Sequence, residues 1–250
     1  MSKLTDSWVM RTFPQPNATK RLFCFPFAGG AASAYRQWAS ILGPSIEVCA
    51  IQLPGRENRL LELPYDDCKS LTVALLSALS PFLDKPYALY GHSMGALLAF
   101  ELARSLEDSC SPADGPERVF LAAHRAAHLP LHRSPMADLP QERLIAKLSE
   151  YGGFSNEVLS SPELMELILP AIRADLKLCD TYHFEQKNLL RCPIVVIAGA
   201  QDKQTSIEST YPWAEHTSEQ TEVHVLNGGH FFLHTHSAQV LEIVRTRMLD

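Results

Sequence analysis

The sequence lacks several patterns that define broad classes of protein. No apolar run approaches the roughly 20 residues of a membrane-spanning helix. The net charge of -6 and the lack of a basic cluster give no electrostatic footprint for nucleic acid. The first residues, Met1 to Asp6, lack the charged and then apolar plan of a secretory signal. We therefore expect a cytoplasmic protein that binds neither a membrane nor a nucleic acid.

The cysteines also lack a pattern. No Cys-x-x-Cys pair occurs, and several of the thiols fall in predicted strands, which favours reduced core cysteines over disulfides or zinc ligands. The six residues are Cys24, Cys49, Cys68, Cys110, Cys179 and Cys192.

The distribution of apolar residues predicts one α/β domain over residues 1–250. Hydrophobic residues make up 46% of the chain and charged residues 20%, which excludes wholesale disorder. Strand patterns alternate with helical ones, so the central sheet should be mainly parallel, with helices on both faces. The predicted strands cover residues 21–26, 46–53, 87–90, 117–123, 193–198 and 221–226.

The stretch from Tyr87 to Leu106 organises this fold. An apolar run leads into Gly91-His92-Ser93-Met94-Gly95, and an Ala/Leu-rich helical segment follows. This is the strand, G-x-S-x-G turn and helix of a nucleophile elbow, in which a tight turn exposes the serine above the sheet. The turn also places Ser93 at a helix N-terminus, where the free N-H of Met94 could bind an oxyanion.

A second oxyanion donor is expected in the loop after the first predicted strand. The small residues Phe27-Ala28-Gly29-Gly30-Ala31 form this loop. In α/β hydrolases the corresponding loop supplies the second N-H group, and Ala28 is the residue placed for it. The alternative is an ordinary strand-to-helix turn.

A serine nucleophile requires a base, and ten histidines compete for that role. His92 adjoins Ser93 on a turn that points successive side chains apart. His124, His128 and His132 precede any suitable acid. His230 follows a strand on a glycine-marked loop, and this makes it the candidate base.

The acid that orients this base should also lie at the end of a strand. Asp202 does, and the order Ser93, Asp202, His230 is the one that α/β hydrolases use. We expect Asp175 and Asp180 to be solvated or capping carboxylates instead. A metal site at His230, His234 and His236 is disfavoured because no carboxylate or cysteine has matching spacing.

Residues from about 130 to 190 break the strand and helix rhythm. Helical patterns begin near Pro140 and at Ser161, without an intervening strand. We interpret this insertion as a lid, although the apolar faces are also compatible with an ordinary core. Part of its apolar surface is expected to face the main domain and cover Ser93; the residues concerned are Leu164, Met165, Ile168, Leu169 and Ile172.

Five motifs spread over nearly the whole chain together resemble one family, the type II thioesterases of nonribosomal peptide and polyketide synthesis. They are Phe25-Pro26-Phe27-Ala28-Gly29-Gly30, Gln52-Leu53-Pro54-Gly55-Arg56, Gly91-His92-Ser93-Met94-Gly95-Ala96, Leu169-Pro170 with Arg173-Ala174-Asp175, and Gly228-Gly229-His230-Phe231-Phe232-Leu233. One segment departs from the family. Where the family usually shows Ser-Gly/Ala-Arg-x-Ala-Pro, this chain has Ala122-Ala123-His124-Arg125-Ala126-Ala127-His128, a difference that bears on substrate preference.

The resemblance implies an α/β-hydrolase fold and hydrolysis of acyl groups from the phosphopantetheine arm of an acyl or peptidyl carrier protein. It implies that Ser93, Asp202 and His230 form the triad, that the N-H groups of Ala28 and Met94 form the oxyanion hole, and that no metal or organic cofactor is required. We expect a monomer. Two alternatives stay open: a general carboxylesterase or lipase with the same triad, and a non-catalytic binding protein on the hydrolase scaffold.

Overall fold

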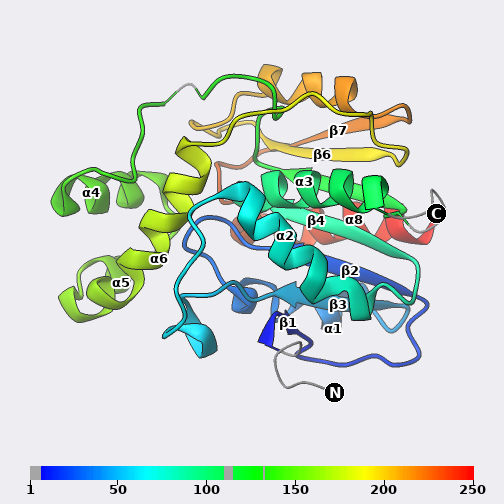
Figure 1. The fold of residues 1–250 in the computed structure, drawn as a ribbon, viewed down its shortest axis with the longest axis horizontal. Coiled ribbons are helices and arrows are strands. Elements are labelled where there is room, and N and C mark those ends of the chain that lie inside the picture. Colours follow the sequence, from blue (N-terminus) through cyan, green and yellow to red (C-terminus); the bar gives the residue numbers. More distant parts are fainter. Residues whose placement is uncertain (1–6, 110–114, 132) are drawn as a thin grey trace.

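The structure is a computed structural model that describes residues 7–109, 115–131 and 133–250. The expectations for residues 1–6, for Cys110 and its loop, and for His132 lie outside the described residues. Figure 1 shows the arrangement of the helices and strands.

Seven strands form one sheet in the order β1-β3-β2-β4-β5-β6-β7. All neighbours pair in parallel except β1, which runs antiparallel to β3. The mainly parallel central sheet is therefore as predicted. The strands are β1 (Val9–Met10), β2 (Lys20–Phe25), β3 (Ile46–Ile51), β4 (Tyr87–His92), β5 (Arg118–Ala122), β6 (Ile194–Gly199) and β7 (Thr221–Leu226).

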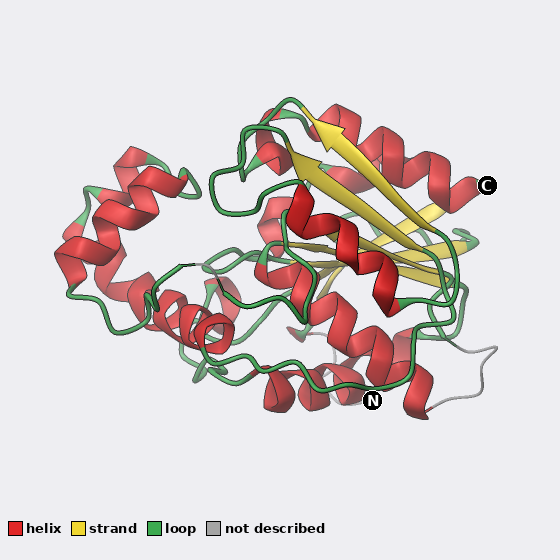
Figure 2. Ribbon diagram, turned by 90° about the horizontal axis from the view of Figure 1, so that it is seen from above, coloured by secondary structure: helices red, strands yellow, loops and turns green. Residues whose placement is uncertain are grey.

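Helices cover both faces of this sheet (Figure 2). Alternate strand residues point to opposite faces, so Phe23 packs in the cluster that contains residues of α2 (Cys68–Leu79) and α3 (Met94–Ser109). Leu22 packs on the other face with residues of α1 (Trp38–Leu42) and α8 (Ser237–Leu249). Every residue of β3, β4 and β6 is buried, as is usual for parallel strands covered on both sides. The short helical segments are η2 (Ala32–Tyr35), η3 (Glu57–Arg59), η4 (Ser80–Phe82), η6 (Glu208–His216) and α7 (Phe232–Thr235).

The insertion contains α4 (Gln141–Tyr151), α5 (Asn156–Leu159) and α6 (Pro162–Asp180), which Figure 1 shows grouped beyond one end of the strands. The Oγ of Ser161 accepts a hydrogen bond from the backbone N-H of Leu164, so it caps α6 as predicted. The insertion has an apolar core of its own. Its buried members are Met136, Ala137, Leu144, Leu148, Met165, Leu169, Ile172 and Leu176.

The described cysteines are all free thiols, and four of the five are buried. Burial raises the pKa of each of these five thiols, to about 12 for Cys49, Cys68, Cys179 and Cys192, so they are protonated at neutral pH. Among the helices that the structure describes, none is long and apolar enough to cross a membrane.

Candidate active site

The turn between β4 and α3 holds Ser93 in a strained backbone conformation. Its φ angle of 55° lies in the left-handed region, which residues with a side chain rarely adopt. The backbone N-H of Ser93 donates to the carbonyl of Ala122 at 2.8 Å, which ties the turn to β5. The strain is characteristic of a nucleophile elbow.

Two glycines make this turn sterically possible. A Cβ atom at Gly91 would lie 1.9 Å from the carbonyl oxygen of Gly95, and one at Gly95 would lie 2.1 Å from the carbonyl oxygen of Phe25. Real Cβ atoms do not approach backbone this closely, so both positions require glycine.

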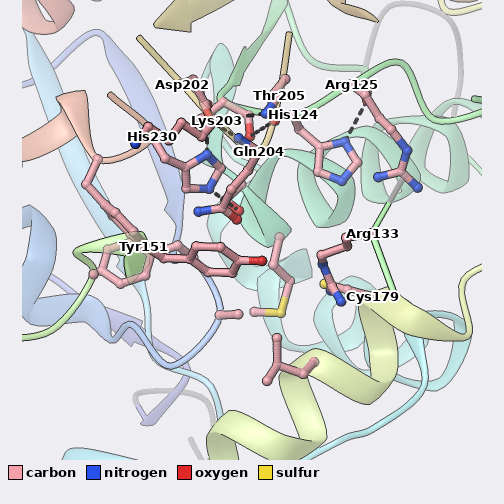
Figure 3. A pocket seen from close by; sticks show the side chains of 18 of the residues that line it. His124, Arg125, Arg133, Tyr151, Cys179, Asp202, Lys203, Gln204, Thr205 and His230 are labelled. Carbon is pink, nitrogen blue, oxygen red and sulfur yellow. Dashed lines mark hydrogen bonds and ion pairs between the residues drawn. The ribbon is translucent and has the colours of Figure 1, made fainter. Parts of the chain in front are cut away.

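The loops after β6 and β7 bring an acid and a base to Ser93. The Nε2 of His230 lies 2.9 Å from the Oγ of Ser93, and its Nδ1 lies 2.7 Å from the Oδ2 of Asp202 (Figure 3). The carboxylate accepts, so Nδ1 carries the proton and Nε2 is free to accept the proton of the serine hydroxyl. The structure thus aligns the three residues that the sequence singled out.

Asp202 is held in place by its own loop. Its side chain is fully buried, and its Oδ1 accepts hydrogen bonds from the backbone N-H groups of Gln204, at 2.7 Å, and Thr205, at 3.1 Å. The other oxygen, Oδ2, is left to face His230. These bonds fix the carboxylate that orients the imidazole.

His92 positions the backbone of the candidate base. Its ring is fully buried, and its Nε2 lies 2.8 Å from the carbonyl oxygen of His230. A carbonyl only accepts, so Nε2 donates. Burial, with a further contribution from His230, holds the pKa of His92 well below its usual value, so the ring stays neutral. Its place beside Ser93 excluded His92 as the base, but nothing in the sequence predicted this contact.

Two residues that line the cavity beside Ser93, Ala28 and Met94, have backbone N-H groups with no partner among the described residues. Free N-H groups beside a serine hydroxyl can stabilise an oxyanion that forms there.

The loop that carries Ala28 is anchored to α6 by a buried ion pair. Asp175 accepts two hydrogen bonds from the guanidinium of Arg56, at 2.7 and 2.9 Å, and another from the backbone N-H of Gly29 at 2.7 Å. Arg56 also donates to the carbonyl of Gly30 at 3.1 Å. The expectation that Asp175 is a solvated or capping carboxylate was wrong, because its side chain is only 1% exposed and fully paired.

Asp180 behaves more as expected. Its Oδ2 accepts from the backbone N-H groups of Met136 and Ala137 at 2.7 and 3.0 Å, and the carboxylate forms an ion pair with Arg133. It therefore caps a loop of the insertion, although its side chain is buried rather than solvated.

The cavity at Ser93 has a volume of about 430 Å³. Residues that follow β2, β4, β5, β6 and β7 form its floor, and the insertion forms the opposite wall. The wall consists of Leu131, Arg133, Leu148, Tyr151, Gly153, Phe154, Leu176 and Cys179.

The apolar residues of α6 that were expected to cover Ser93 do not form this wall. Met165 is 1% exposed in the core of the insertion, Ile168 packs against that same core, and neither lines the cavity. Leu164 is 44% exposed. Ile172 does approach the main domain, since a Cβ atom at Gly29 would lie 2.9 Å from its Cγ1. The apolar face of α6 therefore mainly serves the insertion itself.

The described residues contain no group of three or more His, Cys, Asp or Glu side chains that could hold a metal ion. His230 is already paired with Ser93 and Asp202. His236 lies with its Nδ1 2.8 Å from the Oγ1 of Thr235, and His234 packs edge-on against the ring of Phe27.

Comparisons with known proteins agree on one family. A family model described as a thioesterase domain matches residues 20–248. The gramicidin S biosynthesis protein GrsT of Aneurinibacillus migulanus is 34% identical over 239 residues, which cover 96% of this chain and 93% of that protein.

Solved structures give the same result. The type II thioesterase BorB from the borrelidin biosynthetic cluster matches with a TM-score of 0.88 and 35% identity, covering 96% of both chains. YbtT, a type II thioesterase from the yersiniabactin NRPS/PKS biosynthetic pathway, matches with a TM-score of 0.84 and 30% identity over 95% of this chain and 97% of that one.

Substituting Gly95→Ala should destabilise the protein by more than about 3 kcal/mol, because the added Cβ collides with backbone that cannot move independently of β2. Gly229→Ala is the control, since its nearest neighbour would be 3.8 Å away. Urea unfolding of both variants measures the difference. Similar stabilities for the two would contradict the steric account of the elbow.

Substituting Asp175→Leu should cost about 3 to 5 kcal/mol of unfolding free energy, because it leaves the buried Arg56 guanidinium without its counter-ion. Adding Arg56→Met should recover part of that loss. As a control, Lys177→Ala removes an ion pair between α6 and Asp66 whose side chains are 54% and 51% exposed, and it should change stability little. Equal losses of unfolding free energy in the Asp175 and Lys177 variants would show that the buried ion pair contributes no more to stability than the exposed one.

Proposed function

The chain belongs to the thioesterase domain family and is a thioester hydrolase, and from this we propose that it removes acyl groups from the phosphopantetheine arm of carrier proteins. The observation that carries the proposal is the alignment of Ser93, His230 and Asp202 in the lining of a cavity of about 430 Å³. Its relatives serve gramicidin S and borrelidin biosynthesis, which favours a role beside a synthase.

In the proposed mechanism, the Nε2 of His230 accepts the proton of the Ser93 hydroxyl as Oγ attacks the thioester carbonyl. Asp202 stabilises the imidazolium that forms. The N-H groups of Ala28 and Met94 donate to the oxyanion of the tetrahedral intermediate. Collapse of the intermediate expels the thiolate, which takes the proton from His230, and leaves an acyl group on Ser93.

The second half repeats the first with water as the nucleophile. His230 accepts a proton from water as its oxygen attacks the acyl-serine, and then returns a proton to the leaving Ser93 oxygen. The products are the free acid and the unmodified serine. No step in this scheme requires a metal or an organic cofactor.

The charge of the cavity supports a phosphopantetheine substrate. Although the protein carries a net charge of -6, the cavity lining includes Arg125, Arg133 and Lys203. The arm carries a phosphodiester, and cations near the cavity favour its approach. We propose that the insertion over residues from about 130 to 190 is a lid that limits access to the cavity to a long, narrow group such as this arm. We also propose that residues 1–250 form a single domain. We further propose that the protein acts as a monomer in the cytoplasm.

Ser93→Ala should reduce hydrolysis of an acylated carrier protein by a factor of about 10⁴ to 10⁶, and His230→Ala by a similar factor, because the triad acts as a unit. Asp202→Asn should cost less than either. Mass spectrometry of the carrier protein before and after addition of enzyme measures acyl release. Retained turnover in the Ser93 variant would overturn the assignment.

Parallel assays separate the proposed substrate from the alternatives. The wild-type enzyme should show a higher kcat/KM for a carrier-bound acyl group than for the same acyl group on coenzyme A or as an oxygen ester. A preference for the oxygen ester would identify a general carboxylesterase, and binding without turnover would identify a non-catalytic protein.

Chain-length preference should depend on the wall residues Leu148 and Leu176. Truncating either to alanine enlarges the cavity, and because a pocket discriminates one methylene by about 1 to 3 kcal/mol, the ratio of kcat/KM for longer over shorter acyl chains should rise tenfold or more. Met165→Ala is the control, since Met165 lies in the same apolar core without lining the cavity.

These assays are run below the unfolding temperature of each variant, because all three truncations remove buried apolar volume. If the dependence of kcat/KM on chain length changes in the Met165 variant alone, or stays unchanged in both leucine variants, Leu148 and Leu176 do not determine chain-length preference.

A further inference from the structure

His124 is a buried polar residue in the cavity that the proposed catalytic scheme does not use. It lies two residues after the end of β5 and is 8% exposed. It also belongs to the segment in which this chain departs from the pattern Ser-Gly/Ala-Arg-x-Ala-Pro. Its side chain lines the same cavity as Ser93 and His230 (Figure 3).

The backbone around His124 is fixed on both sides. The N-H of Ala123 donates to the carbonyl of Ile197 at 2.9 Å, and the carbonyl of His124 accepts from the indole N-H of Trp213 at 3.0 Å. Trp213 is fully buried. The imidazole is therefore presented to the cavity from a rigid position.

The hydrogen bonds of His124 determine its tautomer. Its Nδ1 lies 2.6 Å from the carbonyl oxygen of Arg125, and since a carbonyl only accepts, Nδ1 carries the proton. The neutral ring then has a lone pair on Nε2. This nitrogen has no hydrogen-bond partner among the described residues, and the ring that carries it faces the cavity.

The ring is neutral under assay conditions. Burial, reinforced by the neighbouring Arg125 cation, lowers the pKa of His124 to about 3. The ring therefore offers the cavity an acceptor and no positive charge at neutral pH.

The charges around His124 decide which donor suits it. Arg125 is half-buried and uses its Nε to bind the carbonyls of Leu129 and Pro130, both at 3.0 Å, with no carboxylate partner among the described residues. Arg133 is paired with Asp180, and Lys203 also lines the cavity. Arg125, which lacks a carboxylate partner among the described residues, repels an ammonium group, whereas a hydroxyl can donate to Nε2 without adding charge.

We propose that His124 Nε2 accepts a hydrogen bond from the substrate and so selects acyl groups that carry a hydroxyl on the chain. This inference rests on the proposed thioesterase function and names its substrate class. A plain acyl chain that fills the cavity displaces water from this acceptor without replacing its hydrogen bond, and an aminoacyl chain brings a cation next to Arg125. The cavity of about 430 Å³ is large enough for short and medium chains of this kind.

The test compares three acyl groups on one carrier protein: butyryl, 3-hydroxybutyryl and 3-aminobutyryl. The kcat/KM of the wild type for the hydroxyl compound should exceed that for butyryl by about five- to a hundredfold, the range expected for one hydrogen bond that the plain chain cannot make. The amino compound should be the poorest of the three. Equal rates for all three, or a preference for the amino compound, would overturn the proposal.

Two variants separate recognition from a structural role. His124→Gln places an amide near the position of Nε2 and can keep an acceptor there, whereas His124→Asn places its amide near Nδ1 and can keep only the bond to the Arg125 carbonyl. The ratio of hydroxybutyryl to butyryl kcat/KM should persist in the Gln variant and fall toward one in the Asn variant. A merely structural role would instead lower all rates in both variants and leave the ratio unchanged, which would also overturn the proposal.

His224→Asn is the matched control. It makes the same substitution on β7, where His224 contacts Glu222 and does not line the cavity, so the ratio should stay at the wild-type value. The same assay distinguishes failure of the proposed function from failure of this inference. If the wild type hydrolyses none of the three carrier thioesters, the proposed function is wrong. If it hydrolyses all three equally, only the role of His124 is refuted.

Discussion

The contact between the elbow and β2 is the constraint on which the rest of the site depends. A Cβ atom at Gly95 would lie 2.1 Å from the carbonyl oxygen of Phe25, so no side chain fits there, and Ser93 in the same turn has a φ of 55°. The packing around a sheet that is buried on both faces holds the backbone in this strained conformation. Gly95 lies at the start of α3 and Phe25 precedes the loop that carries Ala28, and residues of both segments, Ala28, Ser93 and Met94, line one cavity.

The remaining groups reach Ser93 because parallel strands end at one edge of the sheet. Asp202 follows β6 and His230 follows β7, the two strands beyond β5. Loops at such an edge need anchors, and the chain supplies them with buried polar contacts. His92 holds the carbonyl of His230, and the N-H groups of Gln204 and Thr205 hold the carboxylate of Asp202. Each anchor acts on the backbone or on an acid, and none competes for the Oγ of Ser93.

Local patterns in the sequence predicted strands β2 to β7 and the elbow, because each of these features depends on residues close together in the chain. Asp202 and His230 were predicted from their places after strands and from the order Ser93, Asp202, His230. Contacts between distant segments were harder. Arg56 and Asp175 are 119 residues apart, and a carboxylate on a helix gives no local sign that it is buried against a guanidinium. Both residues belong to the recognised motifs, which was the available signal. Likewise, the spacing of Met165 and Ile168 predicted a buried face but could not say that the insertion covers this face itself.

Different residues of the cavity serve catalysis and substrate selection, which explains how such a fold can change its substrate without changing its reaction. The floor is constrained by steric contacts and hydrogen bonds that tolerate little substitution, as at Gly95 and Asp202. His124 extends from a fixed backbone into the cavity, and its Nε2 bonds to none of the described residues. A substitution there alters which acyl group is bound and leaves the proton path from Ser93 to His230 intact. Specificity can therefore vary at this position independently of catalysis.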